Sequence, residues 1–163
     1  MIVLKKILTF FFTIYAKYTL GNWHAKIRAN GFTRLSRQTE VGQNVHFNGF
    51  KIYGKGNCKI GNNFHSGFGC IVVNSFHNYN GEALPYDNTN INKEIIIEDN
   101  VWLGVNVTLL GGCHIEEGAI IQAGSVVSGK ISKCAIAGGH PAREFSKRNI
   151  KKYEELKAKK MFN

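Results

Sequence analysis

The sequence predicts an all-β repeat protein in which short parallel strands wind into a coil. Two observations carry this prediction: an aliphatic residue recurs at every sixth position of residues 97–127, and a compact residue usually stands two positions before the next one. Residues two apart in a strand share a face, so each hexad supplies one short strand with two inward side chains. The aliphatic positions are Ile97, Leu103, Leu109, Ile115, Ile121 and Val127. The compact positions hold Val101, Val107, Cys113, Ala119, Ser125 and Ile131, and five of these six residues are compact.

A period of six excludes the main alternatives. Helical residues six apart point in different directions, and six residues leave too little room for a strand and a reversal. A chain that bends by the same angle at every hexad closes a triangle in about 18 residues, and stacked triangles form a parallel β-helix. An earlier, less regular tract at residues 41–72 extends the coil, with a bulge expected between Gly49 and Gly54.

The chain is expected to divide into a basic, apolar helical segment at 1–30, the coil at 31–142 and a basic segment at 143–163 with a helix over 149–160. The longest uncharged run near the N-terminus covers residues 7–16, too short for the roughly 20 residues of a membrane span, and no small-x-small cleavage motif follows it. Two alternatives remain for this retained helix: it lies against a membrane surface, or it packs on the coil or on a partner subunit.

The net charge of +10 is carried by the two flanks of the chain. Residues 1–39 contain seven basic residues and no acidic one, and residues 143–163 contain eight basic and three acidic residues. A nucleic-acid binder would show basic residues interleaved with aromatic ones through the domain, so none is expected as a partner. The pattern fits an anionic leaflet or a phosphorylated small ligand, and we expect a cytoplasmic protein, at most peripheral to the inner membrane.

The six-residue periodicity is absent from residues 78–93, which are rich in turn-forming residues. A loop of this length in a compact domain is usually functional. His77 stands where the loop leaves the coil, and a neutral imidazole is the standard general base near pH 7. The loop also carries side chains suited to hydrogen-bond sugar hydroxyls and to stack on sugar faces. These candidate acceptor-binding residues are Asn78, Tyr79, Glu82, Tyr86 and Asp87.

Metal chemistry is not expected. His65 and His77 lie 12 positions apart, so they fall on different sides of the triangle, whereas a metal site needs three ligands that converge. The four cysteines form no C-x-x-C pair, and we interpret them as small buried hydrophobes.

Three short motifs give the chain a resemblance. Residues 100–104 (Asn-Val-Trp-Leu-Gly), 121–127 (Ile-Gln-Ala-Gly-Ser-Val-Val) and 137–142 (Ala-Gly-Gly-His-Pro-Ala) resemble, in order and spacing, the hexapeptide-repeat acyltransferases. That family includes maltose and galactoside O-acetyltransferases, serine acetyltransferase, xenobiotic acetyltransferases and O-acetyltransferases of surface polysaccharides. The resemblance implies a left-handed β-helix, a homotrimer with active sites between neighbouring coils, and acetyl-CoA as acyl donor.

The resemblance also implies site residues. His77, 25 positions before Trp102, takes the place of the catalytic base, and Trp102 joins the acceptor site. A backbone N–H near Gly104 and Val105 would meet the oxyanion. The residues implied for the cofactor are Gly104, Val105, Ala123, Gly124, Ser128, Lys130 and Arg143. The expected reaction is direct transfer of acetyl to a sugar hydroxyl in surface polysaccharide biosynthesis; the alternatives are N-acetylation of an amino or nucleotide sugar, and a non-catalytic binding module.

Overall fold

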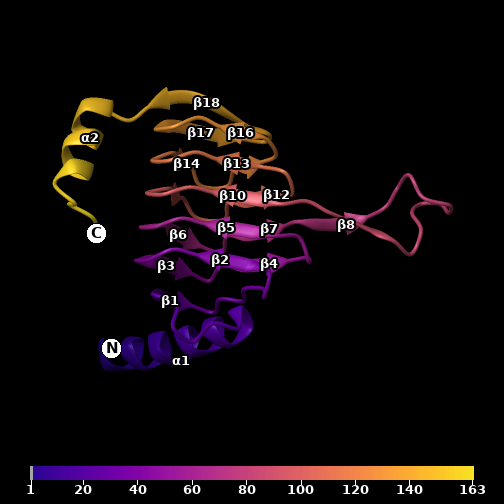
Figure 1. Ribbon diagram of the computed structural model, residues 1–163, viewed down its shortest axis with the longest axis horizontal. Helices are drawn as coiled ribbons and strands as arrows, with labels where there is room; N and C mark the ends of the chain where they lie inside the picture. The colour runs from indigo at the N-terminus through magenta and orange to yellow at the C-terminus, as the bar shows by residue number, and fades with distance from the viewer. Residues whose placement is uncertain (1) are drawn as a thin grey trace.

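A computed structural model describes residues 2–163 and shows a triangular coil of stacked strands closed by a helix at one end (Figure 1). Its strands form three parallel sheets, one for each side of the triangle, in a left-handed β-helix. The seven-stranded sheet contains β1 (Ile27–Gly31), β3 (Val45–Asn48), β6 (His65–Phe68), β11 (Trp102–Leu103), β14 (Ile120–Ile121), β17 (Ala135–Gly139) and the antiparallel β18 (Ala142–Lys147). The predicted repeat architecture is therefore confirmed.

The other two sides are built in the same way. The four-stranded sheet contains β4 (Lys51–Tyr53), β7 (Ile71–Val73), β12 (Thr108–Leu110) and β15 (Val126–Val127). The five-stranded sheet contains β2 (Thr39–Val41), β5 (Cys58–Ile60), β10 (Ile95–Ile97), β13 (His114–Ile115) and β16 (Lys130–Ile131). A fourth, two-stranded sheet of β8 (Ser75–His77) and β9 (Asn90–Asn92) projects from the coil.

The strand register confirms the period and shows where it breaks. Leu109 pairs with Val127, 18 positions on, and all six predicted aliphatic positions are buried. Ile115 pairs with Ile131, only 16 positions on, so this last coil is two residues short. Ile131 therefore takes a large aliphatic position of the interior, and its placement at a compact position of the hexad was wrong. In the earlier tract the register shifts between His46 and Asn48, before the expected bulge.

The coil that carries the projection is the longest. Val72 pairs with Leu109, 37 positions on, because the ribbon of β8 and β9 is inserted between β7 and β10. We call residues 75–92 the arm. The expected loop over residues 78–93 is therefore only partly a loop, since its stems pair as strands.

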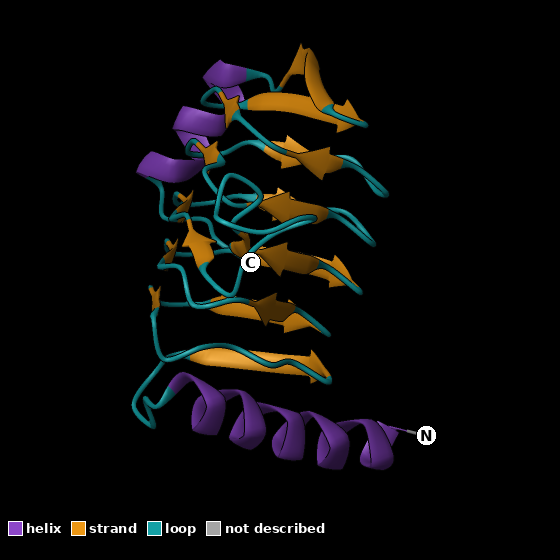
Figure 2. Cartoon of the chain, turned by 90° about the vertical axis from the view of Figure 1, so that its right-hand side faces the viewer, coloured by secondary structure: helices purple, strands orange, loops and turns teal. Residues whose placement is uncertain are grey.

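Two helices flank the coil. Helix α1 (Ile2–Leu20) lies across the end next to β1, at right angles to the stacking direction (Figure 2). Its Ala16 and Leu20 side chains are buried in the same core as the strands. Helix α2 (Ile150–Ala158) packs beside the opposite end, and the side chain of Asn149 caps it by accepting a hydrogen bond from the Lys152 N–H. The predicted helix over 149–160 is confirmed, with an end two residues earlier. No helix in the described part of the chain is long and apolar enough to span a bilayer.

Candidate active site

The arm holds His77 on a rigid stem. His77 pairs with Asn90 at the last step of the β8–β9 ribbon, so its backbone is fixed by the strand although its side chain is exposed. The imidazole stacks on the ring of Tyr86, with centroids 3.9 Å apart and planes 4° from parallel. Stacking fixes the plane of the ring and leaves its nitrogen-bearing edge open. Within residues 2–163 the His77 ring accepts and donates no hydrogen bond, so a bound molecule can reach both nitrogens.

Asp87 shapes the tip of the arm. Its carboxylate accepts hydrogen bonds from the Thr89 hydroxyl at 2.5 Å, the Thr89 N–H at 2.8 Å and the Glu82 N–H at 3.2 Å. These bonds hold the pKa of Asp87 below its usual range. A Cβ on Gly81 would lie 1.9 Å from a carboxylate oxygen of Asp87, so any other residue there would displace this carboxylate. Asp87, predicted to bind the acceptor, is thus occupied in organising the loop.

The other residues of the arm that are predicted to bind the acceptor differ in whether their side chains already make hydrogen bonds within the chain. The Asn78 side chain donates to the Thr89 hydroxyl and accepts from the Asn80 N–H, so it is also structural. Tyr79 stacks on Phe76 and keeps an exposed face. Glu82 is exposed, and its carboxylate makes no hydrogen bond or ion pair within residues 2–163. Of the residues predicted to bind the acceptor, Tyr79, Glu82 and the Tyr86 hydroxyl therefore have polar or aromatic groups that no hydrogen bond within residues 2–163 occupies.

The residues predicted to bind the cofactor include a corner of small residues. Gly104 and Ala123 stack on neighbouring coils where the seven-stranded sheet turns into the four-stranded one, and a Cβ on Gly104 would lie 2.6 Å from the Ala123 nitrogen. Gly124 has a φ of +71° with open space beside it. The Gly104 N–H donates to the Ile121 carbonyl at 2.8 Å, whereas the Val105 N–H has no backbone partner within residues 2–163. At this corner the N–H groups of Val105 and Ala123 are therefore both without an acceptor within residues 2–163.

The side chains predicted to contact the phosphates differ in whether another residue already pairs with them. Lys130 is held by Glu116 at 2.6 Å, and this partner raises the pKa of Lys130 and lowers that of Glu116. Arg143 donates one N–H to the Ala142 carbonyl and is otherwise exposed. Ser128 is exposed in a turn beside Gly129, where a Cβ would meet open space. Arg143 is thus the cation of the predicted set that is free to meet a phosphate.

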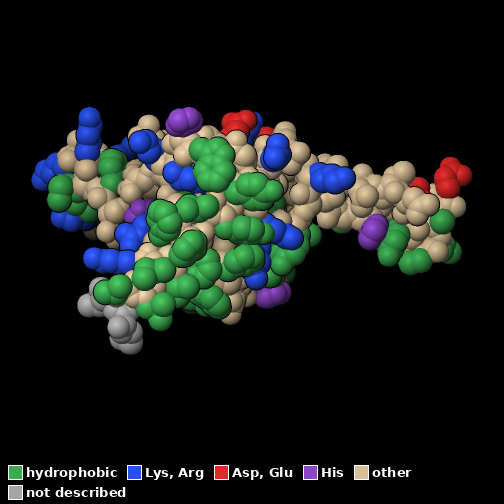
Figure 3. Space-filling model, turned by 90° about the horizontal axis from the view of Figure 1, so that it is seen from below, with side chains coloured by type: hydrophobic (Ala, Val, Ile, Leu, Met, Phe, Trp, Pro, Cys, Tyr) green, Lys and Arg blue, Asp and Glu red, His purple; other side chains and the backbone are tan. Residues whose placement is uncertain are grey.

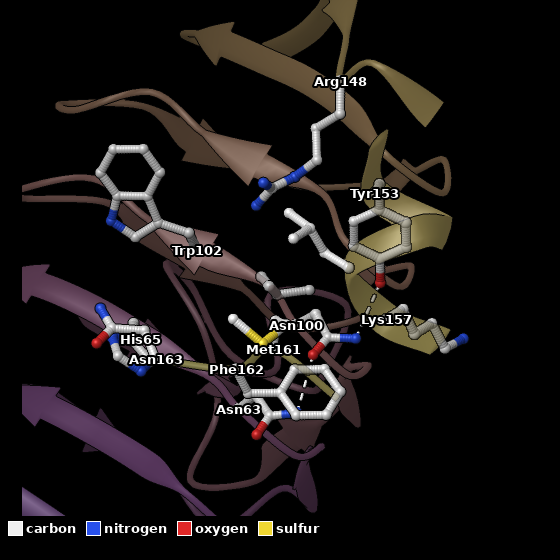
Figure 4. A pocket seen from close by; sticks show the side chains of 12 residues that line it. Asn63, His65, Asn100, Trp102, Arg148, Tyr153, Lys157, Met161, Phe162 and Asn163 are labelled. Atoms are coloured by element: carbon white, nitrogen blue, oxygen red, sulfur yellow. Dashed lines mark hydrogen bonds between the residues drawn. The ribbon is translucent and has the colours of Figure 1, made fainter. Parts of the chain in front are cut away.

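Trp102 lines a different cavity, of about 450 Å³, between β11 and the C-terminal residues (Figure 4). Its ring is half-exposed and lies in this cavity with His65, Arg148, Tyr153 and Met161. The Arg148 Nε donates to the Gly118 carbonyl at 2.6 Å, which leaves the outer guanidinium nitrogens for a ligand. The structure therefore separates Trp102 from the arm residues with which the prediction grouped it.

Sequence reasoning missed this cavity because α2 closes it from outside the repeat. His65 was considered only as a metal ligand, yet the register stacks His46, His65 and Trp102 in one outward row. The rings of His46 and His65 lie 4.4 Å apart. Burial, the neighbouring His65 and Arg28 lower the pKa of His46. The signal was present in the spacing of the outward positions, which the periodic argument did not follow.

No single chain brings the predicted site together. The arm leaves the four-stranded sheet after β7, whereas the corner of Gly104 and Ala123 precedes β12 and β15 at the other ends of these strands. The Trp102 cavity is lined in part by α2. Helix α2 lies on the side of the coil opposite the arm (Figure 1). No group of three His, Cys, Asp or Glu side chains placed to hold a metal occurs in residues 2–163.

Comparisons with known proteins give consistent relatives. The family described as bacterial transferase hexapeptide (six repeats) matches residues 94–129. A putative acetyltransferase of Schizosaccharomyces pombe is 34% identical over 66% of this chain and 55% of its own length. A galactoside O-acetyltransferase of Lactococcus lactis is 33% identical over 71% of this chain and 60% of its own length. A putative lipopolysaccharide biosynthesis O-acetyl transferase of Escherichia coli is 42% identical, over 36% and 30% respectively.

Solved structures agree on the fold. A hexapeptide-repeat acetyltransferase of Vibrio cholerae superposes with a TM-score of 0.69 at 22% identity, covering 80% of this chain and 76% of its own. Its complex with acetyl coenzyme A gives a TM-score of 0.59 at 25% identity, with 72% and 64% covered. The chain spans little more than half the length of the curated relatives from Schizosaccharomyces pombe and Lactococcus lactis. The chain therefore contains the bacterial transferase hexapeptide repeat, is similar in sequence to acetyltransferases over about two thirds of its length, and has their left-handed β-helix fold.

Proposed function

We propose that this chain is an acetyl-CoA-dependent O-acetyltransferase that modifies a sugar hydroxyl in surface polysaccharide biosynthesis. The observation that carries the proposal is the exposed imidazole of His77, fixed by the arm and by Tyr86 at the insertion in the coil. The names of its relatives support this: a galactoside and a lipopolysaccharide O-acetyltransferase, and an acetyltransferase crystallised with acetyl coenzyme A. Both the activity and the acceptor are part of the proposal.

His77 acts as general base. It takes the proton of the acceptor hydroxyl while the oxygen attacks the thioester carbonyl, so a C–O bond forms as the carbonyl oxygen becomes an oxyanion. The free Val105 N–H stabilises that oxyanion. When the C–S bond breaks, the CoA thiolate takes the proton from the imidazolium. The products are an acetyl ester and CoA thiol, and no acyl-enzyme forms.

The cofactor lies along the corner of Gly104, Ala123 and Gly124. Glycine and alanine there allow the pantetheine arm to approach the backbone. Arg143 meets a phosphate with its free nitrogens. Lys130 contributes less than the sequence suggested, because Glu116 already neutralises it.

The active enzyme is a homotrimer in which each site is shared by two chains. The support is geometric: the arm with His77 and the corner with Gly104 lie at opposite ends of the four-stranded sheet, too far apart for one acetyl group to reach both. A ring of three chains would bring the arm of one against the corner of the next.

The enzyme also contacts the inner membrane surface through α1. Support comes from the basic charge of residues 1–39 and from the large apolar side chains that α1 exposes. This contact would place a soluble enzyme next to a glycan carried on a lipid.

The test is steady-state turnover with acetyl-CoA and a panel of galactosides and maltose, read as free CoA thiol. His77→Ala should lower kcat by about 10²–10⁴-fold, as expected when a general base is lost. His24→Ala is the matched control, because His24 is also exposed and lies outside the arm and the corner. EDTA should leave the rate unchanged. A His77→Ala enzyme that keeps the wild-type kcat would contradict the proposal.

A further inference from the structure

Helix α1 has two opposite faces. One face, with Thr13, Ala16 and Leu20, packs on the first coil, and the Thr13 hydroxyl accepts a hydrogen bond from the Ala29 N–H at 3.0 Å. The other face exposes large apolar side chains at positions that repeat every three or four residues, as one side of a helix requires. We call it the outer face; it consists of Leu4, Ile7, Phe11, Ile14 and Tyr18.

The outer face is extensive, and its surroundings are basic. The exposed fractions of its side chains run from 38% for Ile14 to 62% for Tyr18. Figure 3 shows apolar side chains gathered over this end of the molecule, with basic ones around them. Lys6 and Lys17 lie 11 positions, or three helical turns, apart and so share the flank between the two faces. A helix with an apolar side and basic flanks matches an anionic lipid surface rather than a second, equally basic copy of this chain.

The position of α1 fixes how a docked molecule would stand. The helix lies across the end of the stack, with its outer face pointing away from β1, so a membrane beneath it is perpendicular to the stacking direction (Figures 1 and 2). The arm emerges after β7 in the third coil, two strand spacings from β1 along the series β1, β3, β6. Two spacings of about 5 Å and a helix about 10 Å thick hold the arm roughly 20 Å above the lipid.

We propose that α1 docks the protein end-on to an anionic membrane and that this height selects a lipid-linked glycan acetylated on a sugar several units away from the lipid. The inference rests on the proposed O-acetyltransferase function. The arm extends sideways from the stack, parallel to the membrane, so it keeps the same height along its length and does not approach the sugar that adjoins the lipid (Figure 1). When the outer face is docked, each coil between α1 and the arm adds one strand spacing to the distance between His77 and the membrane surface.

The first experiment measures docking and orientation with tryptophan fluorescence. The chain has two tryptophans, Trp23 and Trp102. One variant, Trp23→Phe with Trp102→Phe and Phe11→Trp, reports from the outer face. A second, Trp23→Phe, reports from Trp102 in the fourth coil. Both are mixed with vesicles of phosphatidylglycerol and phosphatidylcholine whose acyl chains are brominated.

The outer-face reporter should lose most of its emission and Trp102 should keep its own. Quenching of both would overturn the end-on orientation, and quenching of neither would overturn docking. Phe11→Glu should abolish sedimentation with these vesicles, whereas Phe145→Glu should not. Phe145 is a matched control, since it is 61% exposed at the far end of the stack and Phe11 is 59% exposed.

The second experiment tests the acceptor. Lipid-linked glycans of one and of several sugars are presented in the same vesicles, and the same glycans are presented after release from the lipid. We expect acetylation of released glycans of either length, but among the lipid-linked ones only of distal sugars on the longer chains. Equal acetylation of the lipid-proximal sugar would overturn the height selection. If no released glycan is acetylated, the O-acetyltransferase proposal fails and the acceptor inference fails with it, while the fluorescence result still decides the orientation.

Discussion

The shared site predicts that two inactive variants rescue each other. His77→Ala removes the base from every arm, and Ala123→Trp fills the corner of every chain, where Ala123 is exposed. Alone, each trimer should be inactive. In a randomly mixed trimer an intact site needs an arm from an Ala123→Trp chain and a corner from a His77→Ala chain.

The size of the rescue follows from this geometry. At equal concentrations each of the two conditions is met in half of the cases, so about one quarter of the sites are active in a cyclic ring. The assay is CoA thiol release after the two variants are unfolded together, refolded and compared with each variant treated alone. The chain that carries both substitutions, mixed with either single variant, should give no rescue, because no combination then contains both an intact arm and an intact corner.

Failure to rescue would refute the reasoning, provided that both variants form mixed trimers. Mixing is checked with a tag on one variant and detection of the other after affinity capture. A site built within one chain would give no rescue in captured mixed trimers. That result would require the arm to fold back across the four-stranded sheet, contrary to its extended course.

Three further predictions concern stability and reactivity. Thr13→Val should lower the free energy of unfolding by about 1–3 kcal/mol in urea titrations, because the buried Ala29 N–H loses its acceptor; Thr108→Val, on an outward strand position, should change little. The pKa of His46 is lower in the folded state than its ordinary value of 6.5, so the unfolded chain binds more protons as the pH falls below 6.5. The free energy of unfolding should therefore decrease as the pH falls from 6.5 toward the folded-state pKa. His46→Asn should make the free energy of unfolding less dependent on pH in this range. Burial raises the pKa of three thiols, so they should not react with a thiol reagent at pH 8 until the protein unfolds; their pKa values are about 12, 11 and 12 for Cys58, Cys70 and Cys113.

The coil was predictable because its physics is local and repeated. A strand that buries Leu103 must bury Leu109 and Ile115 in the same way, so one error in register would expose every later position. The shorter last coil could not be found in this way. The residue type of Ile131 does not show which of the two inward positions of a hexad it occupies. Only its pairing with Ile115 shows that it occupies the large aliphatic position.

The candidate site was less predictable because its parts come from outside the repeat. The position of His77 follows from the point at which the six-residue repeat stops. Its stacking on Tyr86 depends on the conformation of the 12-residue tip of the arm, which lies outside the repeat. Asp87 looked like a ligand group, since a carboxylate in a loop can bind sugar or order its own backbone, and composition does not separate the two roles. The three hydrogen bonds that it accepts assign it the second.

Helix α1 shows why the sequence left two alternatives open. The usual argument places the large apolar side of a helix inward, and on that basis the helix is either a cap or a membrane anchor. Here the side that packs on the coil combines Leu20 and Phe12 with the small residues Thr13 and Ala16, and the small residues let the helix approach the first strand closely enough for the Thr13 hydroxyl to accept its N–H. Most of the large apolar side chains remain exposed away from the coil, so capping the coil and exposing an apolar surface are two consequences of one arrangement. Deleting residues 2–20 would therefore uncover the buried core around Ala29 and Leu35 whether or not a membrane is bound. Only substitutions confined to the outer face, such as Phe11→Glu, separate the two roles.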